Sequence, residues 1–541
     1  MVFQDRNWTA RPWIIEDEQL RTSSEGFVIK VRARGTFDAC EFTWEGALTG
    51  HADGRVDFRI EGHTTGDFWR NRLGLCILHP AQASGDPAIV EHADGAIEVT
   101  SFPDAISPHQ PFTSMRALAH ELPHGLQTTI RMTGEIFESE DHRNWSDASF
   151  KHYCTPISLP FPVLVRSTDT IRQSVHLAIS KADEGVNLGR PKDSSSTDPV
   201  ELVIDSSWHR LPELGIQLDA DGHRLTGPEI ELLRALCLSH VRIDLLAGDG
   251  PDRLEGALHD ATAIGARLVG ALVGAEPTTY AKFRDDPRID HWLAFDPATK
   301  VTDPALVEQV RKVLGANVGG GTNLYFTELN RGRPSGPEII AFSINPQVHA
   351  ADDQSVMQNA TTLGAIARNA RMLYPKVRLE ISPITLRPRF NPNATAPELD
   401  LSNTPLPSRV DARQCLPFGA AWTVLALKAI AESGCIDAVT AYQATGWEGL
   451  IERAEGSPQP ADFPSHPGVP FPVYWVFRDL ADARGVHPCT STDPDRIDAL
   501  VLDCGIVLVA NLTANPTVAI VEGQHVRVPP HGVVRVLRPG T

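Results

Sequence analysis

The strongest constraint on the fold is an alternation of apolar runs and helical segments that repeats between residues 200 and 465. Eight runs have the length of a single strand, and they begin near Gly215, His240, Ala266, His291, Leu324, Ile339, Val377 and Asp437. Runs that are apolar on both faces and joined by helices are typical of parallel strands. Eight such units over about 250 residues predict a closed (β/α)8 TIM barrel. A doubly wound open sheet is the alternative, although no Gly-x-Gly-x-x-Gly follows the first run.

The segments on either side of this region have the alternation of β structure. Toward the amino end, runs such as Phe27–Ala33 and Val56–Gly62 place apolar and polar residues on opposite faces. They predict an antiparallel, sandwich-like β domain over residues 1–197. Short apolar runs with turns predict a small β domain over residues 483–541. The predicted fold is therefore multidomain α/β, with the central TIM barrel over residues 198–482.

The chain carries a large excess of negative charge. Among its 541 residues, 68 Asp and Glu oppose 49 Lys and Arg, which gives a formal net charge of −19. This field would repel polyanions, so neither nucleic acid nor an anionic membrane surface is an expected partner. A small ligand of either charge remains possible, because the charge of a local pocket can differ from the net charge of the protein. The sequence leaves assembly into a homo-oligomer open.

The sequence also predicts a cytoplasmic protein without a cofactor. The first residues do not form a secretory signal, and no run of roughly 18 apolar residues predicts a transmembrane helix. The eight cysteines are scattered without a Cys-x-x-Cys pair, which favours a reducing compartment and argues against a zinc ribbon. No EF-hand-like loop is present, and no Gly-Lys-Ser/Thr follows Gly319–Gly321, which we expect to permit a close backbone approach or a sharp bend. Neither a metal nor an organic cofactor is predicted.

Two glutamates lie at or near the ends of predicted barrel strands. Glu328 belongs to the end of the fifth run, and Glu380 to the end of the seventh. Active sites of TIM barrels lie at the carboxyl ends of the strands, and a carboxylate there is costly unless it is paired or functional. Two carboxylates that face one cavity suffice for acid/base hydrolysis. The alternative is that each forms a salt bridge at the rim, with Arg331, Arg378 and Arg387 as candidate partners.

Further residues near the predicted strand ends are candidates for substrate binding. Asn345 and His349 follow the sixth run and could hydrogen-bond hydroxyls or a carbonyl oxygen. Tyr442 and Trp447 follow the eighth run and could stack on a sugar face, and Arg413 could place a guanidinium near the site. Each has a structural alternative: an Asn- and Pro-containing turn, aromatic plugs of the barrel rim, and a charged helix start.

One segment of the amino-terminal domain is unusually dense in polar and aromatic residues. Residues 140–153 include Arg143, Asn144 and Lys151. The segment could reach over the barrel mouth, where these three side chains would contact substrate. The alternative is a domain–domain interface held by salt bridges.

Four motifs are distinctive enough to suggest a family: Trp69–Pro80, Asp141–Lys151, Phe326–Arg331 and Ala341–Ala350. Together they resemble the D-apionate lactonase family of bacterial sugar catabolism, and the resemblance covers the whole chain. It implies an amino-terminal domain, a central TIM barrel and a carboxyl-terminal domain. The implied activity is hydrolysis of D-apionolactone to D-apionate in the cytoplasm.

The barrel is also distantly similar to retaining glycoside hydrolases, which carry catalytic glutamates after strands four and seven. Glu380 on the seventh run matches the nucleophile position. The family pattern has Asn-Glu after strand four, whereas this chain has Thr327-Glu328 after the fifth run, so Glu328 matches less closely.

These observations lead to a hypothesis for a lactonase. Glu380 would activate water or attack the lactone carbonyl, and Glu328 would protonate the departing ring oxygen. Asn345, His349 or Arg413 would stabilise the developing oxyanion. The alternative enzyme is a glycosidase acting on a small glycoside. A second alternative is that the protein is not an enzyme but a non-catalytic sugar-binding protein on a hydrolase scaffold.

Overall fold

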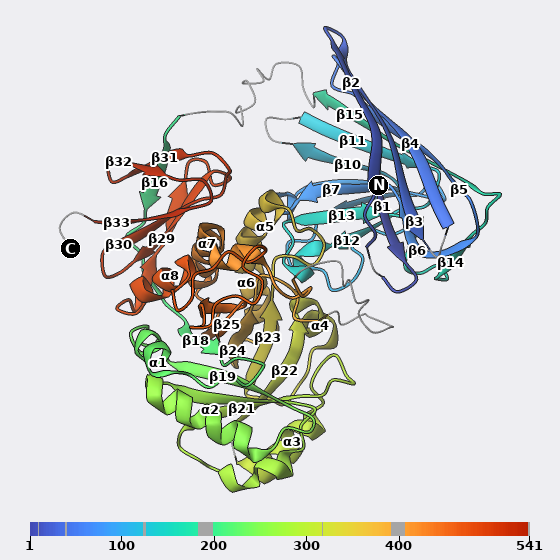
Figure 1. The fold of residues 1–541 in the computed structure, drawn as a ribbon. Coiled ribbons are helices and arrows are strands. Elements are labelled where there is room, and N and C mark those ends of the chain that lie inside the picture. The colour runs from blue at the N-terminus through green and yellow to red at the C-terminus, as the bar shows by residue number, and fades with distance from the viewer. Residues whose placement is uncertain are drawn as a thin grey trace. The chain divides into compact units, whose positions relative to one another are not determined.

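The computed structural model describes residues 1–541 except 9, 38–39, 123–125, 182–197, 316, 391–405 and 539–541. The described chain forms two compact units (Figure 1). The first unit comprises residues 1–142 and 149–181, and the second comprises residues 143–148, 198–390 and 406–538. The barrel and the carboxyl-terminal strands therefore belong to one unit. The short segment 143–148 of the predicted amino-terminal domain belongs to that second unit as well.

The first unit is built around a nine-stranded antiparallel sheet in the order β2-β3-β4-β5-β15-β11-β10-β8-β9. These strands are β2 (Ile14–Ser23), β3 (Gly26–Phe37), β4 (Cys40–His51), β5 (Val56–Thr64), β8 (Pro87–His92), β9 (Ile97–Ser101), β10 (Met115–Leu122), β11 (Leu126–Thr133) and β15 (Thr170–Lys181). Two three-stranded sheets, β1-β6-β14 and β12-β13-β7, accompany it. They consist of β1 (Val2–Asp5), β6 (Phe68–Gly74), β14 (Val163–Val165), β12 (Glu138–Asp141), β13 (Ser149–Tyr153) and β7 (Cys76–Pro80). The predicted antiparallel β domain is confirmed.

Period-two alternation along the strands produces the core of this unit. On β4, Phe42, Trp44 and Gly46 are buried, while Glu45, between the last two, is exposed. The rings of Phe3 and Phe37 stack in the same core with centroids 3.7 Å apart. The long sheet therefore has one apolar, packed face, and the opposite face carries its polar side chains.

Three buried histidines lie close together inside the first unit. His152 Nε2 on β13 is 2.8 Å from His79 Nδ1 on β7, and the rings of His79 and His120 on β10 have centroids 4.9 Å apart. Burial lowers the pKa of His79 to about 4, and His120 adds to this effect. Burial also lowers the pKa values of His152 and His120. The three imidazoles are therefore neutral in the folded protein at pH 7.

We expect the first unit to lose stability as the pH falls from about 6.5 toward about 4. In this window unfolded histidine binds a proton that folded His79, with its pKa of about 4, does not bind. Acid therefore favours the unfolded state, by about 3 kcal/mol for His79 alone. Hydrogen exchange of the β7, β10 and β13 amides, corrected for intrinsic rates, measures this loss. His79→Gln should flatten the pH dependence, and equal slopes in both proteins would contradict the explanation.

His120 also begins the sequence His120-Glu-Leu-Pro-His124, which has the His-Glu-x-x-His spacing of zinc hydrolases. That motif places both histidines on one face of a helix. His120 lies on strand β10 instead. The segment therefore shares the residue spacing of the zinc-hydrolase motif but not its helical structure at His120.

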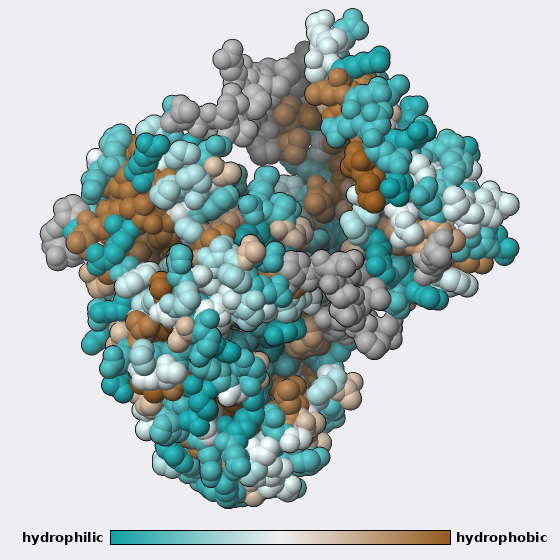
Figure 2. Space-filling model, in the orientation of Figure 1, coloured by the Kyte–Doolittle hydropathy of each residue, from teal (hydrophilic) through white to brown (hydrophobic). Residues whose placement is uncertain are grey.

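The second unit contains eight parallel strands in the order β18 to β25, and β25 closes the barrel by pairing with β18. The strands are β18 (Glu213–Gln217), β19 (His240–Leu246), β20 (Arg267–Val273), β21 (Ile289–Phe295), β22 (Val318–Tyr325), β23 (Ile339–Ile344), β24 (Arg378–Ile384) and β25 (Ala438–Thr445). The helices are α1 (Gly227–Arg234), α2 (Pro251–Ile264), α3 (Pro304–Leu314), α4 (Phe326–Gly332), α5 (Asp353–Asn359), α6 (Leu363–Leu373), α7 (Pro417–Ser433) and α8 (Pro472–Leu480). The predicted TIM barrel is confirmed. Figure 2 shows that the surface on the side drawn is mainly hydrophilic.

The structure corrects the predicted fifth strand. Strand β22 contains the triple glycine and ends at Tyr325, and helix α4 begins at Phe326. A Cβ atom at Gly321, where φ is +119°, would overlap the carbonyl oxygen of Ala341 on β23. The glycine thus permits the expected close approach of two strands. Glu328 consequently lies in the first turn of a helix and not on a strand.

Strands from both ends of the second unit form its remaining sheets. One sheet has the order β28-β16-β31-β32 and the other β17-β27-β29-β30-β33. The strands are β16 (Val200–Ile204), β17 (His209–Arg210), β27 (Gly485–His487), β28 (Cys489–Ser491), β29 (Ile497–Leu502), β30 (Ile506–Asn511), β31 (Thr517–Val521), β32 (Gln524–Val528) and β33 (Val533–Leu537). The carboxyl-terminal β domain is confirmed, and it includes two short strands that precede the barrel. None of the helices among the described residues is both long and apolar enough to cross a bilayer.

Candidate active site at the carboxyl ends of the barrel strands

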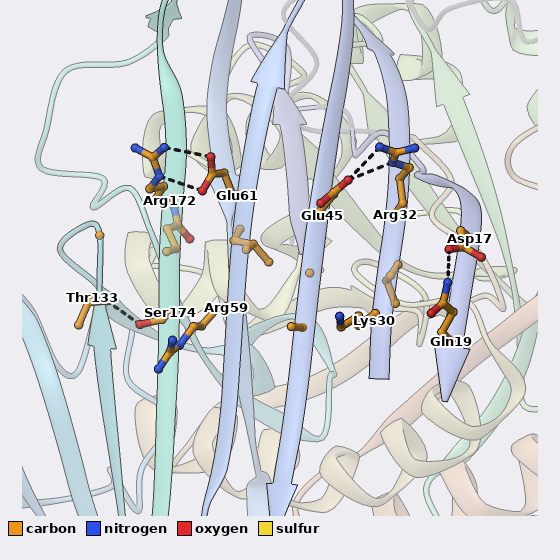
Figure 3. Close-up of a pocket in the computed structure, with 16 residues that line it drawn as sticks. Asp17, Gln19, Lys30, Arg32, Glu45, Arg59, Glu61, Thr133, Arg172 and Ser174 are labelled. Carbon is orange, nitrogen blue, oxygen red and sulfur yellow. Dashed lines mark hydrogen bonds and ion pairs between the residues drawn. The ribbon is translucent and has the colours of Figure 1, made fainter. Parts of the chain in front are cut away.

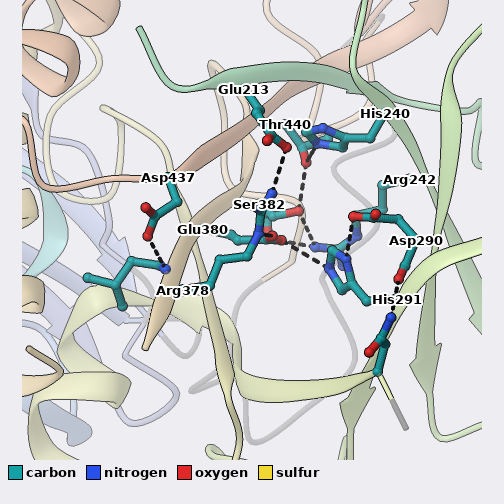
Figure 4. A network of polar contacts seen from close by, with 12 residues as sticks. Glu213, His240, Arg242, Asp290, His291, Arg378, Glu380, Ser382, Asp437 and Thr440 are labelled. Atoms are coloured by element: carbon teal, nitrogen blue, oxygen red, sulfur yellow. Dashed lines mark hydrogen bonds and ion pairs between the residues drawn. The ribbon is translucent and has the colours of Figure 1, made fainter. Parts of the chain in front are cut away.

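Glu380 lies in the amino-terminal half of its barrel strand. It is the third residue of β24 and stands in register with Ala341 of β23. Its Oε1 accepts a hydrogen bond of 2.7 Å from Arg378 Nε, and its Oε2 is 3.2 Å from His291 Nε2 (Figure 4). The prediction that Glu380 lies at the strand's carboxyl end is wrong, because the strand continues to Ile384.

Two cationic groups keep Glu380 ionised. Burial alone would raise the pKa of Glu380, but His291 and Arg378 outweigh burial and hold it well below its usual range. In return, Glu380 and Asp290 raise the pKa of His291 to about 9 despite its burial. Arg378 also donates a hydrogen bond of 2.8 Å to Glu213. Such a paired network is typical of structural ion clusters, so the predicted alternative of a salt bridge with Arg378 describes Glu380 better.

Arg242 links the barrel interior to the carboxyl ends of the strands. Its side chain on β19 is 0% exposed. Nη1 donates to the carbonyl oxygen and Oγ of Ser382 on β24, at 2.6 and 3.1 Å. Nε donates to Asp244 Oδ1 on β19 at 2.7 Å, and Nη2 to Asn323 Oδ1 on β22 at 2.8 Å. One planar guanidinium thereby fixes groups from three strands.

A second arginine, Arg389, shares two of these partners. Its Nη1 donates to Asp244 Oδ2 at 3.1 Å, and its Nη2 donates to the carbonyl oxygen and Oδ1 of Asn323, both at 2.8 Å. Burial alone would raise the pKa of Asp244, but Arg242 and Arg389 hold it below its usual value. Burial lowers the pKa of Arg389 to about 10. Charged donors therefore gather where β19 and β22 end, the region in which barrel enzymes bind substrate.

The loops that follow β22, β23 and β24 are hydrogen-bonded to one another. Tyr325, the last residue of β22, hydrogen-bonds Asn345 after β23 and donates to the carbonyl oxygen of Phe390 at 3.3 Å. Gln347 Nε2 donates to the carbonyl oxygen of Leu386, after β24, at 2.7 Å. Asn345, a predicted binding residue, is therefore held at the mouth of the barrel and is 2% exposed.

His349 and Asp147 form a histidine–carboxylate pair beside these loops. His349 Nδ1 lies 2.6 Å from Asp147 Oδ2, and Asn359 Nδ2 lies 3.4 Å from Asp147 Oδ1. The imidazole stands edge-on to the ring of Trp145, with centroids 5.4 Å apart. The side chain of His349 is 24% exposed and that of Asp147 is 7% exposed. A carboxylate at Nδ1 fixes the ring and leaves Nε2 as the atom that can take a proton.

Asp147 belongs to the segment 143–148, which packs on the barrel side of the second unit. Asn144 Oδ1 accepts a hydrogen bond of 3.0 Å from Asn330 Nδ2 on α4. The guanidinium of Arg331, also on α4, lies 5.1 Å from the centre of the Trp145 ring. Asn144 therefore lies next to α4, the helix that follows strand β22.

The other predicted residues of this region lie in different surroundings. Glu328 is 6% exposed, and its Oε1 is 3.5 Å from Lys300 Nζ. Arg143 is 3% exposed within the second unit. Lys151 lies on β13 of the first unit, with its ammonium 5.4 Å from the centre of the Tyr153 ring. Substrate contact by these side chains stays a prediction.

Arg413 has protein partners at every nitrogen of its guanidinium. Nε and Nη2 donate to Asp411 at 3.0 and 2.8 Å, Nη2 also donates to Gln347 at 3.0 Å, and Nη1 donates to Asp353 at 2.6 Å. Burial alone would raise the pKa of Asp411, but Arg413 lowers it to about 2. This saturation favours the structural alternative over a role in stabilising an oxyanion.

The two predicted aromatic residues after the eighth strand differ in exposure. Tyr442 is 2% exposed, and its hydroxyl lies 2.7 Å from Thr423 Oγ1 on α7. Its φ of 61° turns the side chain away from the alternation expected of a strand. Trp447 is partly exposed and donates from Nε1 to Ser457 Oγ at 2.9 Å. Tyr442 therefore has the packing role of the structural alternative, and Trp447 stays a candidate.

Glu448 follows directly. It is half-buried and accepts hydrogen bonds from one cationic and one neutral donor. Its Oε2 accepts hydrogen bonds from Arg409 Nε at 2.9 Å and Gln443 Nε2 at 3.2 Å. Burial raises the pKa of Glu448, although Arg409 and Arg389 oppose this effect. A carboxyl group whose pKa is raised by burial, at the end of a barrel strand, is a candidate proton donor.

Comparison with known proteins places both units in one family. The model of the D-apionate lactonase N-terminal domain matches residues 1–182, and that of the D-apionate lactonase TIM barrel domain matches residues 296–485. The chain belongs to the D-apionate lactonase family. A D-apionate lactonase from Brucella anthropi is 29% identical over 577 residues, which cover 99% of this chain and 91% of that relative.

Solved structures similar to this D-apionate lactonase family member include glycoside hydrolases. A GH30 endoxylanase from Clostridium papyrosolvens C71 has a TM-score of 0.39 and 9% identity, covering 63% of this chain and 97% of its own. An endo-beta-1,4-mannanase from Thermotoga petrophila has a TM-score of 0.33 and 12% identity, covering 57% of this chain and 84% of its own. At these scores the likeness carries no functional argument.

Several candidate residues of this D-apionate lactonase family member were not singled out from the sequence. Arg242 and Asp244 alternate with apolar residues on β19, and that pattern could have identified both as facing the barrel interior. Glu448 has no distinguishing sequence signal, because its burial depends on tertiary packing. Asp147 lies 202 residues before His349, so nothing local connects the pair.

Proposed function

We propose that this protein hydrolyses D-apionolactone to D-apionate. The observation that carries the proposal is the match of two separate domain models of the D-apionate lactonase family, supported by a relative of that name along 99% of the chain. Lactone hydrolysis needs a base that activates water, donors that stabilise an oxyanion and an acid that protonates the departing ring oxygen. Candidates for all three lie at the carboxyl ends of the barrel strands.

His349 is the proposed general base. Its Nε2 takes a proton from water while the water oxygen attacks the lactone carbonyl carbon. Asp147, 2.6 Å from Nδ1, orients the ring and stabilises the imidazolium that forms. The C–O bond to the ring oxygen then breaks, and the product is a carboxylate with a free hydroxyl. This assignment gives the water-activating role, predicted for Glu380, to a group that is partly exposed.

Glu448 is the proposed acid for the departing ring oxygen, because burial favours its protonated form. Glu328, predicted for this role, lies in the first turn of α4 with its Oε1 3.5 Å from Lys300 Nζ. Arg389 and Asn345 are the proposed donors to the oxyanion. All eight cysteines are free thiols, which supports the inference of a reducing compartment such as the cytoplasm.

The proposal predicts turnover of D-apionolactone by the purified protein, with one acid equivalent released per lactone. A pH-indicator assay measures this release, and nitrophenyl glycosides of small sugars serve as the matched alternative substrates. We expect lactone hydrolysis and no release of nitrophenol. Cleavage of a glycoside without lactone hydrolysis would favour the glycosidase. Saturable binding of the lactone without turnover would favour the non-catalytic sugar-binding protein.

A further inference from the structure

The polar face of the nine-stranded sheet in the first unit contains a pocket of about 710 Å³ (Figure 3). One row of side chains crosses it in register on neighbouring strands. The row consists of Gln19, Lys30, Ala47, Arg59, Ser174 and Thr133. Strands in a sheet are about 4.8 Å apart, so the backbones of Lys30 and Arg59 flank Ala47 at a separation of about 10 Å. The short side chain of Ala47 leaves space between two cations.

A second row of the same pocket contains its three carboxylates. Asp17 Oδ2 accepts a hydrogen bond of 2.9 Å from Gln19 Nε2, and the two glutamates are paired with arginines. Glu45 Oε1 accepts a hydrogen bond of 2.9 Å from Arg32 Nη2. Glu61 accepts two hydrogen bonds from Arg172, both at 2.9 Å. Figure 3 shows these two ion pairs side by side across the sheet. The glutamates are therefore occupied by their own arginines and do not neutralise Lys30 or Arg59.

Lys30 and Arg59 have no hydrogen bond or ion pair to any other residue that the structure describes. Both are exposed at the floor of the pocket. The same row offers the amide of Gln19, whose Nε2 also donates to Asp17, and the hydroxyls of Ser174 and Thr133, whose oxygens lie 2.7 Å apart. No aromatic side chain lines the pocket, so the stacking surface typical of neutral-sugar sites is missing from its lining. The arrangement suits an anion that also carries hydroxyl groups.

We propose that this pocket binds a polyhydroxylated carboxylate, that is, a sugar acid. The carboxylate lies above Ala47 between Lys30 and Arg59, and the hydroxyl groups bond Gln19, Ser174 and Thr133. The pocket volume is within the range of small-molecule sites. The sugar acid can be free or can form part of an anionic oligosaccharide, because both present the same group. The proposal is independent of the lactonase reaction, since it involves none of the barrel residues.

Isothermal titration of the full chain with D-galacturonate, tri-D-galacturonate, D-galactose and inorganic phosphate tests the proposal. We expect saturable binding of at least one of the two uronates with a dissociation constant on the order of 1 mM or below. D-galactose, which has no carboxylate, should show no saturable binding. A tighter constant for the trimer identifies an oligosaccharide as the preferred source, and a tighter constant for the monomer identifies the free acid.

Three variants locate the binding. Lys30→Gln combined with Arg59→Gln should weaken uronate binding by about tenfold or more, and Ala47→Leu should do the same by filling the space without changing charge. Arg55→Gln is the matched control, because Arg55 pairs with Asp53 outside the pocket. No saturable uronate binding, or binding that neither pocket variant weakens, would overturn the proposal. Phosphate binding as tight as uronate binding would overturn the assignment to a sugar acid. Lactone turnover, measured in parallel, should be equal in all variants.

Discussion

Replacement of His349 by Ala is expected to lower kcat/KM for D-apionolactone by about 100-fold or more, because general base catalysis by a positioned histidine contributes at least that factor. The imidazole combines a carboxylate at Nδ1 with a side chain that is 24% exposed, so water can reach it. The decisive readout is the initial rate of lactone hydrolysis, from which kcat/KM is obtained for the wild type and for the variant.

Asp147→Asn tests the positioning role in the same pair. The amide keeps the size of the side chain but lacks the charge that stabilises the imidazolium, so kcat should fall while KM changes little. His525→Gln is the matched control, because His525 is exposed on strand β32 of the same unit. Thermal unfolding of each variant verifies that the fold is intact. A His349→Ala protein that retains activity within about threefold of wild type would contradict the assignment.

The barrel could be predicted because its signal is periodic and repeated. Each apolar run is local, and eight of them leave few alternatives to a closed parallel sheet. The residues at which individual strands end are harder to predict from the sequence. Leu324, Tyr325 and Phe326 form one continuous hydrophobic run, yet the strand ends at Tyr325 and the helix begins at Phe326. Sequence alone therefore placed Glu328 on the wrong kind of element.

The candidate site depended on contacts that have no local signature. His349 was identified as a candidate, but its partner Asp147 comes from a segment 202 residues away. Arg413 and Tyr442 were candidates by position, and the structure shows that their polar groups are bonded to Asp411 and Thr423. A strand-end location predicts that a residue can reach a site. Only the packed structure shows whether its polar atoms are already engaged.

Glu380→Gln is expected to lower the free energy of unfolding of the second unit by about 3 kcal/mol, because it leaves the buried His291 and the half-buried Arg378 without their shared carboxylate. Turnover per folded molecule should remain within about threefold of wild type, since the network lies at the amino ends of the strands, away from the proposed base. Urea unfolding followed by tryptophan fluorescence measures the stability, and lactone assays normalised to folded protein measure the turnover. Glu308→Gln is the matched control, because Glu308 forms an exposed pair with Arg311 and should matter by less than about 0.5 kcal/mol.

The pH dependence of stability separates this structural role from catalysis by Glu380. The folded pKa of His291 is about 9, above the value of about 6.5 expected for unfolded histidine. The ion pair therefore contributes its full stabilisation below pH 6.5, and the contribution is lost as the pH rises through about 9. Wild-type protein should lose stability across that window, and Glu380→Gln should show a flatter profile. A variant with wild-type stability at every pH but with turnover reduced by about 100-fold or more would instead restore Glu380 as the nucleophile or base.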